Sequence, residues 1–389
     1  MARVEAAAQL PLFETALPEV TSYQEPLLQP SELTILSLGG GQDSTALLYK
    51  LVLDPAFRAR YAPRNLLVLM SDTGNEHQAT LDHVTFLKGF CLLHGIEFVH
   101  LTADMGYHSD SWQSLKGFYH LKGTIGSRAY VKSCTDQLKL QPIYRYINDY
   151  LSEKYGFTRS SKNKKAFGEF VEKFESKISM LIGIAAGEES RCAPTPEVEK
   201  SNFNRRLATI SHMLKAGLTL PTKTKAARKM VKEFEQKVRV LSPAEDFIKE
   251  AKRITTLLFP MSPIWRRESV QVLYPLIPLG LDRKGCQEYM ASTGLPVPPP
   301  SNCKICPFLG EIELLWLHRF LPEDLAEWIE LERVKIEKHA DKGDRNLGVW
   351  GKKLLPEVIA EVIAKHGHMT DQEVQDYKFS HGHCVASQY

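Results

Sequence analysis

The chain has 389 residues, of which 43% are hydrophobic and 24% charged, so it can bury a large core and falls outside the disordered and fibrous classes. Its net charge of +3 is too small for the whole surface to attract a polyanion, and any nucleic-acid site must be a local patch. Without a signal-like N-terminus or a run of about twenty apolar residues, the sequence predicts a cytoplasmic protein. Seven cysteines, an odd number, suit thiols and ligands better than a disulfide framework.

Residues 1–30 contain four prolines and no sustained hydrophobic period, which predicts a flexible N-terminal tail. Within it, the peptide at residues 9–13 resembles the short Gln-Leu-x-Leu-Phe motif with which bacterial DNA-processing proteins dock on the sliding clamp. Such docking uses apolar anchors on a flexible segment. The predicted clamp contacts are Gln9, Leu10, Leu12 and Phe13. The alternative is that Leu12 and Phe13 fold back on the domain.

The stretch from Ser37 to Thr45 reads Ser-Leu-Gly-Gly-Gly-Gln-Asp-Ser-Thr and lies between an apolar run and a helical run. Its glycines let backbone N–H groups approach an oxyanion without interference from Cβ atoms. Ser44 and Thr45 begin the following helix, where N–H groups, hydroxyls and the positive dipole end favour a phosphate. Asp43 would be repelled by that phosphate unless a cation lay between them, which predicts Mg²⁺ at Asp43. An ordinary glycine turn is the alternative.

This loop resembles the PP-loop of ATP pyrophosphatases, Ser-Gly-Gly-x-Asp-Ser, and the phosphoadenosine phosphosulfate reductase-like branch of that superfamily. It lacks the Gly-Lys-Ser/Thr of a Walker loop. It departs from the family pattern at Leu38, which precedes the first glycine, and at Gln42, which replaces a frequent Lys. The resemblance implies ATP and Mg²⁺ as ligands and Asp43 and Ser44 as catalytic residues. It implies nucleotide contacts from Ser37, Gly39, Gly40, Gly41, Gln42, Asp43, Ser44 and Thr45.

Apolar runs at residues 34–38, 65–70 and 96–101 alternate with helical patterns. This rhythm predicts an α/β fold, a Rossmann-like parallel sheet with helices on both faces and a ligand at the carboxyl ends of the strands. The second run ends in Asp72-Thr73-Gly74, an ending typical of the reductase-like branch, which implies that Asp72 and Thr73 lie beside the nucleotide. A helix-capping turn is the alternative for this segment.

Residues 102–133 are rich in Gly, Ser, Tyr and His and are predicted to form a loop over the site. Residues 134–143 then resemble the Cys-Thr-x-x-x-Lys-x-x-Pro-Ile segment of reductase-like proteins from phages and mobile elements. A fourth apolar run, 178–184, leads into a segment close to the family pattern Gly-Ile-Arg-x-x-Glu-Ser-x-Arg, with Ala185 in place of its first Arg. Gly183, Glu188 and Arg191 are the implied nucleotide contacts, and Arg191 suits a phosphate. A surface arginine is the alternative.

The rhythm breaks at residues 195–265, which are helical by period and rich in Lys and Arg, and it resumes at Val270. The sequence predicts a tail over 1–30, a nucleotide-binding domain over 31–194 and 266–335, a basic helical insertion over 195–265, and a helical C-terminal region with a tail over 336–389. The insertion's basic residues suit a phosphate-tracking face, with a solvated helix face as the alternative. They are Arg205, Arg206, Lys223, Lys225, Arg228, Lys229 and Lys232.

Three cysteines carry the metal prediction. Cys303 and Cys306 form a Cys-x-x-Cys-Pro-Phe motif after a proline run, and the family resemblance places Cys134 at the same mouth of the site. Three thiolates suit a 4Fe-4S cluster with one open iron, as in the similar PP-loop tRNA thiolases. Cys286 or Cys192 would be the fourth ligand. Structural zinc and metal-free thiols are the alternatives. The residues His381, His383 and Cys384 also resemble metal ligands, but their position in a polar tail favours disorder.

The resemblance therefore implies an enzyme that adenylates a substrate with Mg-ATP, releases pyrophosphate and prepares the substrate for sulfur transfer. The mobile-element type of the related proteins and the basic insertion favour a nucleic-acid substrate, as in tRNA thiolation or DNA phosphorothioation. A cysteine desulfurase would be a fitting sulfur donor. The alternatives are a phosphoadenosine phosphosulfate reductase acting on a small molecule, although the Glu-Cys-Gly motif of such reductases is absent, and a non-catalytic nucleotide-sensing module associated with DNA.

Overall fold

The computed structural model describes residues 23, 25–129, 133–160, 164–215, 244–259 and 261–381. The clamp-like peptide at residues 9–13, the basic residues from Lys223 to Lys232, and His383 and Cys384 lie outside these ranges. The chain divides into two compact units. Ala193–Arg267 belongs to one of them, and Ser22–Cys192 together with Glu268–Tyr389 forms the other.

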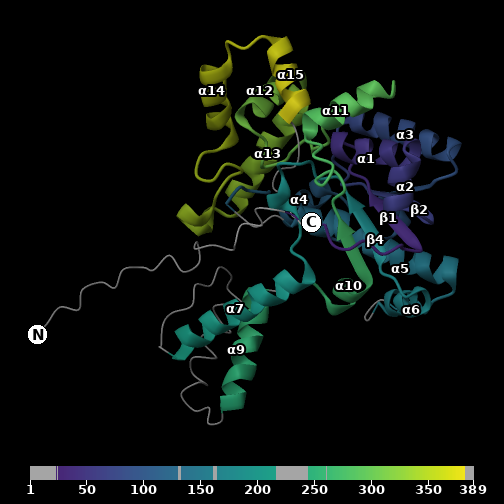
Figure 1. The fold of residues 1–389 in the computed structure, drawn as a ribbon. Helices are drawn as coiled ribbons and strands as arrows, with labels where there is room; N and C mark the ends of the chain where they lie inside the picture. The colour runs from purple at the N-terminus through teal and green to yellow at the C-terminus, as the bar shows by residue number, and fades with distance from the viewer. Residues whose placement is uncertain are drawn as a thin grey trace, which may run out of the picture. The chain divides into compact units, whose positions relative to one another are not determined.

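The larger unit is built on a five-stranded parallel sheet, whose strands lie in the order β3-β2-β1-β4-β5. Figure 1 labels β1, β2 and β4 of this sheet. The strands are β1 Leu33–Ser37, β2 Asn65–Ser71, β3 Glu97–Leu101, β4 Ile178–Ile182 and β5 Val270–Leu273. The central strands are apolar on both faces, as expected for a sheet covered by helices on both sides. The predicted α/β fold with a parallel sheet is confirmed.

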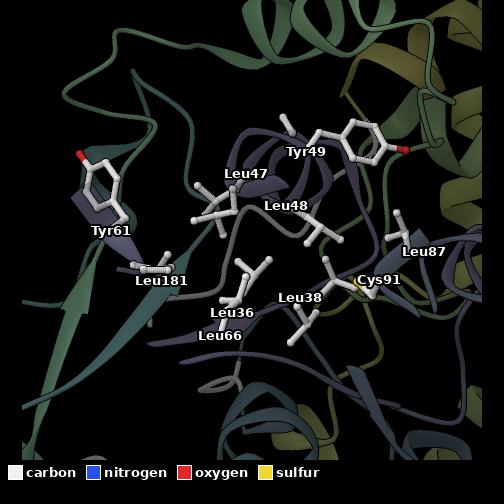
Figure 2. Packing of buried hydrophobic residues seen from close by; sticks show 14 of the residues in the cluster. Leu36, Leu38, Leu47, Leu48, Tyr49, Tyr61, Leu66, Leu87, Cys91 and Leu181 are labelled. Atoms are coloured by element: carbon white, nitrogen blue, oxygen red, sulfur yellow. The ribbon is translucent and has the colours of Figure 1, made fainter. Parts of the chain in front are cut away.

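One face of the sheet is covered by four helices. They are α1 Gln42–Leu53, α2 Pro55–Tyr61, α3 Gln78–Leu93 and α11 Arg283–Ser292. Figure 2 shows the core beneath them, in which Leu47 and Leu48 of α1 meet Leu36 of β1 and Leu181 of β4. The α2 helix begins after Asp54, whose carboxylate accepts the N–H of Phe57, with Pro55 at the first helical position.

The opposite face is covered by α5 Gln141–Tyr155 and α6 Lys165–Phe174 (Figure 1). The Tyr144 hydroxyl of α5 lies 3.7 Å from the sulfur of Met180 in β4. A π-helical stretch, Thr135–Leu140, leads directly into α5. The segment predicted as an irregular loop contains a 3₁₀ turn, Ala103–Met105, and the helix α4 Leu115–Lys122, so the loop prediction for residues 102–133 was only partly right.

The C-terminal helices of this unit pack around a second hydrophobic cluster. They are α12 Glu311–Phe320, α13 Pro322–Lys338, α14 Leu355–His366 and α15 Asp371–His381, with a 3₁₀ turn at Ala340–Arg345. Trp328 of α13 is fully buried at the centre of this cluster. Because the cluster also includes Leu138, Ile305 and Cys306, these helices support the cysteine-bearing segments.

In the smaller unit, α7 Pro196–Lys215 packs against α9 Ala244–Leu258 through an apolar seam of Ile210, Leu214 and Ile254. The short helix α10 Ile264–Ser269 leads into β5. In the larger unit, a 3₁₀ turn at Glu189–Arg191 follows β4. No helix within the described ranges is both long and apolar enough to cross a membrane.

Candidate functional site

A pocket lies where the strand order reverses. After β1 the chain adds β2 and β3 on one side and later places β4 and β5 on the other, so β1 and β4 are neighbours at the switch point. In open parallel sheets, ligands bind in the crevice beyond the carboxyl ends of the strands at this point. Here Ser37 ends β1 and Ile182 ends β4. Both line the pocket, as do Leu38 and Gly183, which follow them.

The glycine stretch forms the floor of this pocket and leads into α1, with Gly41 as the N-cap residue. The Ser44 hydroxyl accepts the N–H of Gly39 at 3.1 Å and donates to the carbonyl oxygen of Gly41 at 3.2 Å. Gly40 has φ +71°, a left-handed conformation that favours glycine. Ser44 therefore fixes the loop that presents the N-terminus of a twelve-residue helix to the pocket.

Two neighbouring segments pack tightly against the loop backbone. A Cβ atom added to Gly183 would lie 2.6 Å from the Ser44 nitrogen, and one added to Gly41 would lie 2.6 Å from the Ser301 hydroxyl. These positions need glycine because of space, since neither has a left-handed backbone. The end of β4 and the segment at Ser301 thus hold the loop from two sides.

Charged side chains gather at the rim of the pocket. Asp43 forms an ion pair with Arg283 at 3.1 Å, and Arg283 also pairs with Glu188 at 3.1 Å. Glu188 pairs in turn with Arg191. Lys139, Arg191 and Arg283 line the pocket together with Asp43, and Lys139 lies 3.9 Å from Glu76. Three cations next to a helix N-terminus, which a ligand can share with their carboxylate partners, suit a polyanion such as a polyphosphate.

The pocket gathers most, but not all, of the predicted nucleotide contacts. Those that line it are Ser37, Gly39, Gly41, Gln42, Asp43, Ser44, Gly183 and Arg191. Those that do not line it are Gly40, Thr45, Asp72, Thr73 and Glu188. Its volume, about 70 Å³, is below the roughly 300–1,000 Å³ of pockets that enclose a whole small molecule. The pocket as it stands therefore suits one part of a nucleotide, such as its phosphates.

Two loop side chains are engaged by the fold. The Gln42 amide donates to the carbonyl oxygens of Pro298 and Phe379, each at 3.1 Å, and its oxygen accepts from Gln287 at 2.9 Å. The Thr45 hydroxyl lies 3.2 Å from Nε2 of His83 and is fully buried. Gln42 thus connects the loop to α15.

Asp72 and Thr73 form a turn after β2. The Asp72 carboxylate accepts the N–H of Gly74 at 2.8 Å, and its carbonyl oxygen lies 2.9 Å from Nε2 of His108. The Thr73 hydroxyl donates to Glu76 at 2.9 Å and lies 3.4 Å from the sulfur of Cys303. The turn therefore connects the end of β2 to the cysteine segment.

Cys134, Cys303 and Cys306 lie in one neighbourhood, around Tyr119 of α4. Burial raises the pKa of Tyr119, and the three thiols raise it further. None of the six cysteines in the described ranges forms a disulfide. Within those ranges, no three His, Cys, Asp or Glu side chains are arranged to hold a metal ion. The metal site at these three thiols therefore stays a prediction of the sequence.

The two cysteines considered as a fourth ligand lie elsewhere. Cys286 is fully buried on α11 in the core beneath α1, and burial raises the pKa of its thiol to about 12. Cys192 is buried after Arg191, and burial also raises its pKa to about 12. Both environments favour the neutral thiol over the thiolate that a metal requires.

Four polar pocket residues were missed by sequence reasoning: Ser71, Lys139, Arg283 and Ser301. Lys139 lies in the segment that resembles Cys-Thr-x-x-x-Lys-x-x-Pro-Ile, but the sequence does not indicate that its side chain lines the pocket. Arg283 is preceded by Asp282, whose side chain caps α11 by accepting the Gly285 N–H at 2.7 Å. That capping pattern could have placed Arg283 in a first helical turn, although not in the pocket.

No protein-family model matches the chain, and no curated protein matches it. Among solved structures, the chain is similar to the U34-tRNA thiolase NcsA from Methanococcus maripaludis with its 4Fe-4S cluster. The two are 12% identical with a TM-score of 0.32, over 88% of this chain and 75% of that chain. Likeness at this level carries neither fold nor function from one protein to the other, and the description of this chain rests on its own residues.

Proposed function

We propose that this protein is an ATP pyrophosphatase that adenylates a substrate and prepares it for sulfur transfer, in the modification of a nucleic acid. The observation that carries the proposal is the pocket at the β1–β4 switch point. There a glycine loop, a helix N-terminus, Asp43 and three cations line one pocket. Together these supply what a bound polyphosphate needs and little that an uncharged ligand would use.

The reaction proposed here joins an oxygen of the acceptor to the α-phosphorus of ATP and breaks the bond to the β-phosphate, so that pyrophosphate leaves. A sulfur nucleophile then displaces AMP from the acceptor. Loop N–H groups together with Lys139, Arg191 and Arg283 would stabilise the charge on the departing pyrophosphate. The three thiols near Tyr119 and the PP-loop-like sequence support sulfur transfer as the second step.

Asp43 is the residue best placed to serve a magnesium ion. Mg²⁺ is usually bound by one or two carboxylates together with substrate phosphates, and Asp43 is the carboxylate that lines the pocket. When bound, the ion would neutralise charge on the phosphates. Since Asp43 is paired with Arg283, ion binding requires that pair to open or to share the carboxylate.

Asp43→Asn tests the proposal. The amide keeps the size of the side chain and can still accept from Arg283, but it lacks the charge that attracts Mg²⁺. We expect Mg-dependent ATP binding, measured by calorimetry, and pyrophosphate release, measured with and without added RNA or DNA, to fall at least tenfold. Asp82→Asn is the matched control, because Asp82 lies on the exposed face of α3. Equal ATP affinity in the Asp43 variant and the parent would contradict the PP-loop interpretation.

A further inference from the structure

A second pocket lies beside α4 and differs in chemistry from the first. It has a volume of about 190 Å³, and its walls include the rings of Trp112, Phe118, Tyr119 and Phe308. An apolar cavity of about 150 Å³ is enough to hold a benzene-sized ring. This pocket therefore has room for one planar ring.

Among the described residues that line the second pocket, none is Asp, Glu, Lys, Arg or His, whereas the first pocket has Asp43 and three cations. Trp112 and Phe118 are stacked with their ring centroids 3.6 Å apart and their planes 11° apart. Aromatic walls of this kind recognise flat rings through stacking. A phosphate or a charged side chain would be poorly solvated here, so the ligand that fits is an uncharged ring.

Polar groups also line this pocket. The hydroxyl groups of Thr124 and Ser133 belong to lining residues, and so does the thiol of Cys134. Tyr119 is held in place because its hydroxyl takes a hydrogen bond from the backbone of Gly126. A pocket lined by four aromatic rings and a few polar groups suits a heteroaromatic ring that carries hydrogen-bonding groups, as a nucleobase does.

The two pockets are connected by one turn of unusual helix. Cys134 lines the second pocket and immediately precedes the π-helical stretch Thr135–Leu140, while Lys139 within that stretch lines the first pocket. A π-helical turn relates residue i to residue i+5, and Cys134 and Lys139 are five apart. The Ser71 hydroxyl donates to the carbonyl oxygen of Leu138 at 2.6 Å, which anchors this turn to the end of β2. Such π-turns are frequent at functional sites.

We propose that the second pocket binds the base of the acceptor nucleic acid, held next to the nucleotide pocket across the π-helical turn. This deepens the function proposed above and rests on it. It makes the acceptor a base taken out of its stack, and not the phosphate backbone. Extrusion costs a few kcal/mol for a paired base and less for a single strand, so single-stranded segments are the preferred substrates.

Binding of single-stranded oligonucleotides, measured by fluorescence anisotropy without ATP, tests this proposal. A mixed-sequence DNA or RNA oligonucleotide is compared with an abasic oligonucleotide of the same length and backbone. We expect the parent to bind the base-bearing strand about tenfold more tightly, since stacking of a base on an aromatic side chain contributes roughly 1–3 kcal/mol. Trp112→Leu and Phe118→Leu should each remove most of this ratio, and Trp112→Phe should keep it. Phe86→Leu, on the partly exposed surface of α3, is the control and should also keep it.

A second measurement on the unmodified chain guards against loss of folding in the variants. Ultraviolet crosslinking of an oligonucleotide with 5-bromouracil should map to the peptide that contains Trp112 and Phe118. An unchanged ratio in both leucine variants, a parent without base preference, or crosslinks only elsewhere would overturn the proposal. So would displacement of the base-bearing strand by ATP alone in the Asp43→Asn variant, which would assign the pocket to adenine. Absence of pyrophosphate release with an intact base preference would overturn the proposed function and not the base pocket.

Discussion

Gly183 shows how closely the nucleotide loop depends on single atoms. Its position at the end of β4 leaves no space for a Cβ atom, which would lie 2.6 Å from the Ser44 nitrogen and 2.8 Å from the Asp43 carbonyl carbon. Both neighbours are backbone atoms and cannot rotate away. The glycine was predicted from the sequence as a nucleotide contact, and the structure gives it a further role in letting the strand approach the loop.

Gly183→Ala should therefore displace the loop. We expect a loss of about 1–3 kcal/mol in the free energy of unfolding, as for other overpacked sites, together with weaker ATP binding. Urea unfolding and calorimetric titration measure the two effects. Gly89→Ala is the control, because a Cβ atom there meets nothing within 4 Å on the helix α3, and it should be neutral or stabilising by up to about 1 kcal/mol. Stability and ATP affinity equal to those of the parent in Gly183→Ala would show that the loop can shift to accommodate a Cβ atom, and would contradict this prediction.

His77 is a buried residue whose charge state the fold controls. Its ring lies edge-on to Trp316 with centroids 5.4 Å apart, and its pKa is lowered to about 3, first by burial and then by Lys378 and Lys304. In the unfolded chain it would titrate near pH 6.5. Between these two values the unfolded state binds the proton and the folded state does not, so acid favours unfolding.

The stability of the parent should therefore fall as the pH drops below about 6.5, with His77 contributing about 2 kcal/mol of the loss by pH 4.5. His77→Gln should lose less stability over the same interval, because glutamine does not titrate. Urea unfolding at pH 7 and at pH 4.5 measures the difference. Parallel pH profiles for parent and variant would contradict the neutral, buried state of His77.

Among the structural elements, the strands were the most predictable from the sequence. The segments that pack around the site were the least predictable. The apolar runs predicted β1, β2 and β4 because a parallel strand buried on both faces needs continuous apolar residues, and shorter runs predicted the more exposed edge strands β3 and β5. Helix α4 was missed, since its glycine and aromatic residues have weak helical propensity, although Ser114 caps it by accepting the N–H of Gly117.

Long-range polar contacts explain why the remainder of the site could not be predicted. Lys378 of α15 donates to Asn302 at 2.8 Å and to Glu313 of α12 at 3.0 Å, and Asn302 donates to Glu313 at 3.0 Å. This buried network holds the segment before Cys303, yet Lys378 and Asn302 are 76 residues apart. No local pattern signals such a pairing, because a buried charge needs its partner in space and not in sequence.

The three cysteines give the test at this scale. The cluster stays a prediction of the sequence, since Cys134, Cys303 and Cys306 lie near Tyr119 without forming a metal site as placed. Should a cluster form, protein purified anaerobically would absorb visible light, and Cys134→Ser, Cys303→Ser and Cys306→Ser would each remove the same band. Cys91→Ser, in the core beneath α1, is the control and should retain the band. A colourless protein that contains zinc would favour the zinc alternative. A colourless protein without metal would favour the alternative of metal-free thiols.

The smaller unit contributes none of the described residues that line the two pockets, all of which belong to the larger unit. Within the smaller unit, Arg206 lies over the ring of Phe259 at 4.4 Å, so this predicted phosphate contact packs against the unit's own aromatic residue. Recognition of a phosphate backbone by this unit then depends on the other predicted basic positions, most of which fall between Lys223 and Lys232.

Replacing Arg228, Lys229 and Lys232 together with Glu should separate nucleic-acid binding from ATP chemistry. If these residues follow phosphates, affinity for RNA or DNA falls for all sequences, and the dependence of the binding constant on salt becomes less steep, because each lost phosphate contact releases about one counterion fewer. Pyrophosphate release without nucleic acid should stay at the parent level. Glu at Lys88, Lys173 and Lys352, exposed in the larger unit, makes the same change in net charge and serves as the control. Equal losses in both triple variants would trace the effect to overall charge, while an unchanged salt slope in the first would return these residues to a solvated helix face and leave the base pocket as the main contact with the acceptor.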